Sequence, residues 1–427
     1  MVLVLIGGLR GSGKELAGAE KQFIEQLSLP QARRFTSAYA QTPDVFLSFA
    51  SLLTGRYTTS VPICGRVNGR QASQNNRWCH QIPQEIPSLP EVLSHYGYRT
   101  LLLNSRFQGA EIFSREFQQH GDSGPTNQLA TTWQYLAQQS QRWWQSNAQH
   151  PRLLVVVTTD LVLETRTDLH QSLDVARPQD PRKGIGLTLW GDRPDHTRQQ
   201  YQQRSAEIGG HIAKLLQPLK ADKPIIVVGG LHGISLVENT PFPRQPVSAL
   251  SSHTLLDRTL RVPLLVHGPG ITPAAQHQPV ELVDILPTLL AQAGAKNPAG
   301  ISGWNLLSKN KDPDPVAYSQ FGDMRSLRSG PFLLTYRGFV HGAGTLDPRI
   351  AEGLNWAMSR ERHKLFLHQV EQDPMQRNNV SHNDPQQFLN IYQQLIQREA
   401  KLATPPPERL TPDRLQKIRL SAGQGYW

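Results

Sequence analysis

A glycine-rich segment near the N-terminus has the spacing of a phosphate-binding loop. Residues 8–14 read GLRGSGK and follow an apolar run, which is the arrangement of a P-loop after its strand. Backbone N–H groups of such a loop hold phosphate oxygens, and its final Ser or Thr binds Mg²⁺. Here the final position is Glu15, whose carboxylate would repel phosphate. Nucleotide binding through Gly8 to Lys14 is therefore one interpretation, and a plain glycine-rich turn is the other.

Nucleophilic side chains give weaker indications. The sequence contains no G-x-S-x-G elbow that would position a Ser-His-Asp triad. Cys64 and Cys79 lie in one polar segment, where they either form a disulfide in an oxidising compartment or remain free thiols. Two cysteines in a chain of this length exclude a disulfide-built scaffold.

Composition excludes several classes of protein. With 427 residues, 38% of them hydrophobic, the chain is long enough for about two or three domains with buried cores. No apolar run approaches the ~20 residues of a membrane-spanning helix. The 44 basic residues exceed the 34 acidic ones, which gives a net charge of +10. This excess fits an ordinary basic globular protein and also fits a protein with an anionic partner.

Short apolar runs alternate with helical patterns, and these elements must position any site. The predicted strands are 2–6, 100–103, 153–157, 225–228 and 263–266, and the predicted helices are 89–96, 131–146, 197–219 and 283–293. Their alternation predicts an α/β fold with a mostly parallel sheet sandwiched by helices. In the helix at 131–146, Trp133, Trp143 and Trp144 form either a partner surface or the buried helix face.

The character of the chain changes after residue 308. Residues 309–315 are rich in charge and proline, as linkers are, and strand-like runs at 332–336 and 364–367 follow. A helical pattern occupies 385–402. We predict an α/β domain over 1–308, a small C-terminal α+β domain over 309–402, and a Pro-rich and basic tail over 403–427. The spacing of apolar residues in the tail predicts a short helix at 408–420. This helix either docks a partner or packs on its own domain.

Six segments occur in an order typical of one family. They are 35–43 (FTSAYAQTP), 50–57 (ASLLTGRY), 93–100 (LSHYGYRT), 261–270 (RVPLLVHGPG), 283–294 (VDILPTLLAQAG) and the segment 365–379. Together they resemble the sulfatase branch of the alkaline-phosphatase superfamily, from residue 2 to about 382. The resemblance implies a large α/β domain followed by a smaller C-terminal domain, in agreement with the pattern of elements.

Members of that family hydrolyse sulfate or phosphate esters with a nucleophile, a divalent metal such as calcium and cationic side chains. Matching the segments residue by residue carries the family's site onto this chain. The metal carboxylate positions hold Gly7 and Gly8, and the later Asp-His metal pair corresponds to Leu231 and His232. The nucleophile position holds Val45, and the position of the supporting arginine holds Phe49.

Three further positions complete the implied site. Ser105 stands where the family often has a lysine, and His253 stands where it has a cationic Lys or His. Asp160 lies near the family's D-P-H turn, but its His position is Val162. Thr42, Asp44 and Ser48 lie close enough in sequence to be considered as replacement nucleophiles, although a new nucleophile would still lack its metal.

These replacements imply a vestigial pocket in a catalytically inactive sulfatase-like protein, a pseudoenzyme with no catalytic residues and no cofactor. We expect a structural or binding role, either as a subunit of an assembly or as a binder of an anionic partner such as a glycan. Nucleic acid is not expected, and an oligomer is possible. The alternatives are an active metal-dependent sulfatase or phosphoester hydrolase that uses calcium, and a nucleotide binder.

The compartment is left open by the sequence. The resemblance favours an extracytoplasmic or periplasmic location, whereas the first residues lack the pattern of a signal peptide, so a cytoplasmic location is also compatible.

Overall fold

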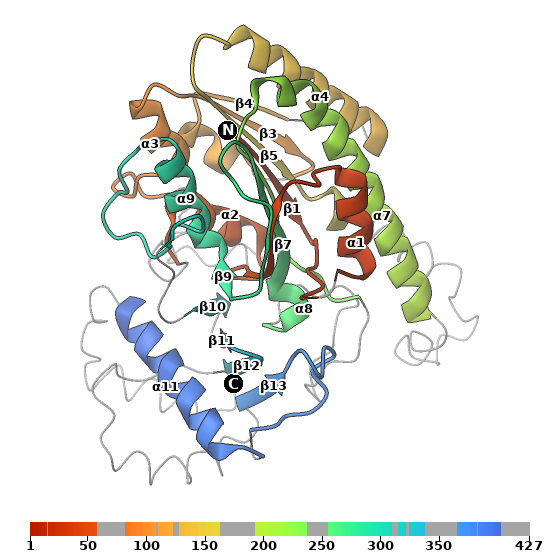
Figure 1. Ribbon diagram of the computed structural model, residues 1–427, viewed down its shortest axis with the longest axis vertical. Helices are drawn as coiled ribbons and strands as arrows, with labels where there is room; N and C mark the ends of the chain where they lie inside the picture. Colours follow the sequence, from red (N-terminus) through yellow and green to blue (C-terminus); the bar gives the residue numbers. More distant parts are fainter. Residues whose placement is uncertain are drawn as a thin grey trace, which may run out of the picture.

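The protein contains a large, mostly parallel sheet and a small antiparallel sheet (Figure 1). The structure is a computed structural model that describes residues 1–14, 16–57, 82–107, 110–122, 128–162, 193–236, 255–309, 315–321, 324–337, 365–381 and 383–402. Cys64, Cys79, His253 and the tail 403–427 lie outside these residues. No helix in the described ranges has the length and apolar character needed to span a membrane.

The large sheet has the order β4-β3-β5-β1-β6-β7-β2-β8, and β9 also pairs with β2. Its strands are β1 (Val2–Gly7), β2 (Arg33–Tyr39), β3 (Arg99–Ser105), β4 (Gln119–Asp122), β5 (Arg152–Thr158), β6 (Ile226–His232), β7 (Arg261–His267), β8 (Ala275–Gln276) and β9 (Val280–Glu281). Only β7 runs antiparallel to its neighbours among these described strands. The parallel strands β3, β5, β1 and β6 therefore end at one edge, which we call the carboxyl edge.

Helices cover both faces of the large sheet (Figure 1). One face carries α1 (Gly18–Leu27), α4 (Leu129–Ser146) and α7 (Arg193–Leu216), and the other carries α2 (Val45–Thr54), α3 (Leu89–His95) and α9 (Ile285–Gln292). Because side chains alternate along a strand, Leu3 and Leu5 enter the core beside α2, and Val4 and Ile6 enter the core beside α1. The predicted fold class is confirmed.

The burial of the α4 tryptophans decides whether they form a partner surface or the buried face of the helix. Trp133, Trp143 and Trp144 are only 1%, 8% and 4% exposed. They belong to the core between α4 and the sheet. The interpretation of a tryptophan partner surface is therefore wrong, and the buried-face interpretation holds.

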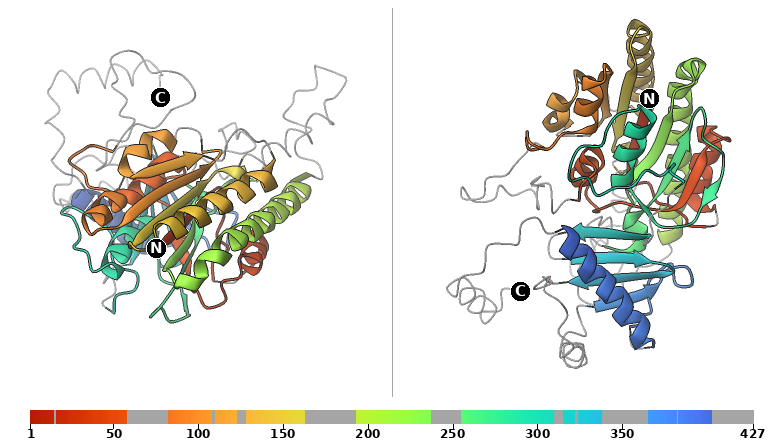
Figure 2. Two further views of the ribbon diagram at one scale, coloured as in Figure 1. Left: turned by 90° about the horizontal axis from the view of Figure 1, so that it is seen from above. Right: turned by 60° about the vertical axis from the view of Figure 1, so that its left-hand side comes forward.

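The small sheet is a meander of four described strands, covered on one face by a single helix (Figure 2). The strands are β10 (Val316–Phe321), β11 (Met324–Ser329), β12 (Phe332–Arg337) and β13 (Leu365–Gln369), and the helix is α11 (Pro385–Leu402). Leu327, Leu334 and Leu367 pack against Phe388 and Ile391 of this helix. The opposite face of the small sheet turns toward the large domain.

A polar seam joins that opposite face to the large domain. The Tyr39 hydroxyl accepts from Arg261 Nε at 3.0 Å and from Arg328 Nε at 2.8 Å, and it donates to Asp257 Oδ1 at 2.6 Å. Glu371 Oε1 accepts from Arg261 Nη2 at 3.2 Å and from Arg328 Nη2 at 2.8 Å. Each charged group in this seam therefore has a partner, which the buried Asp257, Arg261 and Arg328 require.

Candidate functional site at the carboxyl edge of the sheet

The strand register brings four of the predicted site positions to the carboxyl edge. Gly7 at the end of β1 pairs with His232 at the end of β6, and Ser105 at the end of β3 pairs with Thr158 at the end of β5. Asp160 follows β5 by two residues. In open α/β sheets ligands bind outside the carboxyl ends of the strands, so this edge is the candidate site.

Gly7, the last residue of β1, and Gly8, which follows it, differ in the space around them. A methyl group added at Gly7 would make ordinary contacts of 3.5 Å with His232 Nε2, Thr158 O and Thr159 Cγ2. A methyl group added at Gly8 would lie only 2.5 Å from Val162 Cγ2. Gly8 also has a φ of +84°, which side chains rarely adopt. Val162 therefore fills the space that a carboxylate at position 8 would need.

His232 and Leu231 lie at the end of β6. His232 is 4% exposed, and its Nδ1 lies 2.6 Å from the carbonyl oxygen of Gly233. Because a carbonyl only accepts, Nδ1 carries the proton in this contact, which leaves Nε2 toward Gly7. Leu231 is fully buried in the core beside α2. Of the two positions that correspond to the family's Asp-His pair, only His232 therefore has a side-chain atom that can bind a metal.

The one carboxylate predicted at this edge is engaged by its neighbours. The Ser105 hydroxyl donates to Asp160 Oδ2 at 2.5 Å, and Arg106 Nε lies 3.5 Å from Asp160 Oδ1. Asp160 has no exposed surface, and this burial raises the pKa of its carboxyl group, while the Ser105, Thr158 and Arg106 contacts oppose the rise. Arg106 was not singled out in the sequence, and its left-handed backbone (φ +51°) follows directly after β3.

Helix α2 begins at the position predicted for the nucleophile. Asp44 caps it, with Oδ1 accepting from the backbone N–H of Leu47 at 2.9 Å, so this carboxylate has a local structural role. Val45 is the first helical residue and is half-buried. A valine side chain has no nucleophilic atom.

The other two replacement nucleophiles are buried in the same turn. Ser48 is fully buried and its hydroxyl donates to the carbonyl oxygen of Thr42 at 2.8 Å. Thr42 is fully buried as well. Neither hydroxyl reaches the surface of the carboxyl edge, so neither is placed to attack an ester.

Aromatic rings surround the position predicted for the arginine. Phe49 has no exposed surface, and its ring centroid lies 4.8 Å from that of Phe113 and 6.1 Å from that of Phe107. Phe46 extends the cluster, 4.7 Å from Phe107. Such edge and tilted contacts stabilise packing but offer no charge to an anion.

The glycine-rich loop differs from a P-loop in how its amides are used. The N–H groups of Gly8 and Gly11 donate to the carbonyl oxygens of His232 and Arg261 at 2.9 and 3.0 Å. The N–H of Ser12 donates to the buried Glu20 carboxylate at 2.5 Å. Phosphate binding needs such donors free, whereas these three are already bonded within the protein. The geometry therefore favours the plain turn over nucleotide binding.

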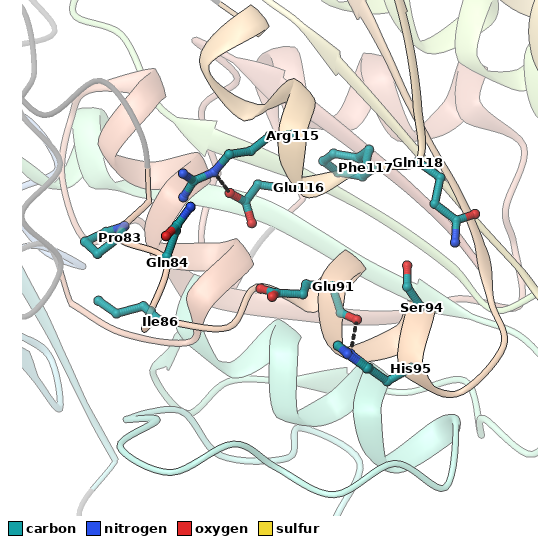
Figure 3. Close-up of a pocket in the computed structure, with 10 residues that line it drawn as sticks. All are labelled: Pro83, Gln84, Ile86, Glu91, Ser94, His95, Arg115, Glu116, Phe117 and Gln118. Atoms are coloured by element: carbon teal, nitrogen blue, oxygen red, sulfur yellow. Dashed lines mark hydrogen bonds and ion pairs between the residues drawn. The ribbon is translucent and has the colours of Figure 1, made fainter.

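A pocket of about 500 Å³ lies elsewhere, between α3 and η1 (Ala110–Glu116) (Figure 3). Its lining residues are Pro83, Gln84, Ile86, Glu91, Ser94, His95, Arg115, Glu116, Phe117 and Gln118. None of the predicted site residues lines it. The buried Glu116 carboxylate faces it but is already paired with Arg115 at 2.9 Å.

Comparisons with known proteins agree with the fold described above. A family model described as Sulfatase matches residues 1–295. The ulvan-active sulfatase of Formosa agariphila is 29% identical over 191 residues, which is 43% of this chain but only 34% of that protein. The matched region thus spans about a third of that relative.

Two solved structures align over almost the entire chain and show the same fold. A 2-O GAG sulfatase has a TM-score of 0.63 at 17% identity, covering 99% of this chain and 93% of its own. The phosphonate monoester hydrolase of Agrobacterium radiobacter has a TM-score of 0.63 at 14% identity, covering 96% and 98%. Because the family model matches more than half of this chain, the chain belongs to the sulfatase family of the alkaline-phosphatase superfamily.

Proposed function

We propose that this protein is a catalytically inactive member of the sulfatase family with a structural or binding role. The observation that carries the proposal is the carboxyl edge itself. Where the family has metal carboxylates, a nucleophile and an arginine, this chain has glycines, a valine and a phenylalanine packed among aromatic rings.

The divalent metal that the family implies does not fit the residues of this edge. A hard cation such as calcium takes about six to eight oxygen ligands. Of the site positions carried over from the family, Asp160 is the one that holds a carboxylate in the described edge, and Ser105 and Arg106 already contact it. Among the residues that the structure describes, no three His, Cys, Asp or Glu side chains are grouped to hold a metal ion. No reaction step is therefore assigned to a metal.

The binding role has support from charge and from the relatives. The chain carries a net charge of +10, and at the carboxyl edge the described Arg106 is already paired with Asp160. One relative is named for ulvan and one solved neighbour for GAG. These observations favour an anionic polysaccharide, or an anionic protein surface, bound by the outer surface of the fold.

The proposal is tested by metal analysis together with turnover assays on the purified full chain. We expect less than 0.1 equivalent of calcium, and no hydrolysis of aryl sulfate or aryl phosphate above the level of buffer, with an active family member assayed in parallel. Stoichiometric metal, and turnover that a chelator removes, would establish the alternative of an active sulfuric or phosphoric ester hydrolase. Native purification followed by identification of bound partners then addresses the binding role.

A further inference from the structure

Two buried carboxylates lie close together where the two domains meet. Glu281, directly before η3 (Leu282–Asp284), and Asp284, the last residue of η3, are 3% and 6% exposed. The backbone N–H of Glu281 donates to Asp284 Oδ2 at 2.8 Å, and that of Trp304 donates to Asp284 Oδ1 at 2.8 Å. Such a pair is costly to bury while both groups are charged.

The small domain supplies the cation that contacts this pair in the described structure. Arg398 Nη2 of α11 lies 2.7 Å from Glu281 Oε2, which also accepts from the Tyr57 hydroxyl. The Tyr318 N–H of β10 donates to Glu281 Oε1 at 2.9 Å. The flanking charges are engaged elsewhere, since Arg56 donates to Ala299 O and Glu399 pairs with Arg325. Two carboxylates thus face one guanidinium.

Docking of the two domains helps to bury the pair. Val283, between the two acids, is fully buried in one core with Leu334 and Phe388 of the small domain. Tyr57 contacts Tyr318 edge to face, with ring centroids 5.5 Å apart. Burial, reinforced by the charge of Glu281, raises the pKa of Asp284 to about 8. When the domains separate, water reaches the pair and the carboxyl group returns toward its ordinary pKa of about 4.

We propose that docking of α11 and the small sheet onto the large domain takes up one proton at the Glu281–Asp284 pair, which makes the domain interface sensitive to pH. The docked state binds more protons than the open state between the two pKa values of Asp284. Docking is therefore strongest at low pH, weakens by up to about tenfold per pH unit as pH rises, and levels off above about 8.

Hydrogen exchange of the α11 amides across pH 5–9 measures this linkage in the full chain. After correction for intrinsic exchange, we expect the opening equilibrium of α11 to rise at least tenfold between pH 5 and pH 8 and then to level off. In Asp284→Asn it should change less than threefold over the same range. Glu85→Gln, which removes an exposed acid near α3, should behave as the wild type does.

A second neutral variant covers a failure of Asp284→Asn to fold. Asp284→Ser keeps an oxygen that can accept from the backbone N–H groups, and it should show the same flat response. Two results would overturn the proposal. One is an opening equilibrium in the wild type that changes less than threefold between pH 5 and pH 8. The other is an equal pH response in the wild type and a folded neutral variant.

Discussion

Replacing Phe49 tests whether the position at which the resemblance predicts an arginine is part of the core. Phe49 has no exposed surface and contacts two rings, Phe107 and Phe113. Truncating a fully buried Phe to Ala costs about 3–5 kcal/mol through lost transfer energy and the cavity left behind. We expect Phe49→Ala to lower the free energy of unfolding by that amount, measured by urea denaturation followed by circular dichroism.

Phe46 provides a matched control on the same helix. It is half-buried and its ring contacts Phe107 at 4.7 Å, so Phe46→Ala should cost at least about 1 kcal/mol less than Phe49→Ala. Phe49→Arg introduces the arginine that the family resemblance predicts at this position, but here it buries a charge without a partner and should destabilise at least as much. If Phe49→Ala or Phe49→Arg stays within 1 kcal/mol of the wild type, the packing argument is refuted.

Two further predictions concern the first strand and the seam. Gly8→Ala should lose at least about 2 kcal/mol more than Gly7→Ala in urea denaturation, because Gly8 combines a positive φ with a 2.5 Å approach to Val162, whereas Gly7 has ordinary contacts. Equal losses at the two positions would contradict the steric argument. Tyr39→Phe should cost about 2–3 kcal/mol, since its hydroxyl bonds three charged groups of the seam. The control Tyr135→Phe, at a 40% exposed site, should cost less than 0.5 kcal/mol, and similar losses in both variants would argue against the seam.

The apolar runs made the central strands predictable. The centres of β1, β3 and β5 are buried on both faces, so each strand contains an uninterrupted apolar run that needs no tertiary information to recognise. β2 was not predicted, because it starts with Arg33 and Arg34, whose charges are held by tertiary contacts. Arg34 bonds to Glu20 at 2.9 Å across the loop, a contact that strand periodicity does not reveal.

The candidate site, like the strands, could be predicted only in part from the sequence. The family resemblance placed Gly7, His232 and Asp160 at strand ends, and a parallel sheet necessarily brings such ends together. Val162 could be identified as a departure from the D-P-H turn, but not as the group that fills the space beside Gly8. The pairing of Arg106 with Asp160 depends on a left-handed residue after β3, for which the sequence carries no glycine signal.

The seam at Tyr39 limits how this fold can be recombined. One phenol oxygen receives two guanidinium groups from different domains, and one carboxylate, Glu371, receives the same two. Hydrogen bonds of this kind are directional, so the small domain fits the large one in a single orientation. A chimera that exchanges the C-terminal domain must therefore carry over Arg328 and Glu371 together, because Arg328 bridges Tyr39 to Glu371, and Glu371 in turn pairs with Arg261 of the large domain.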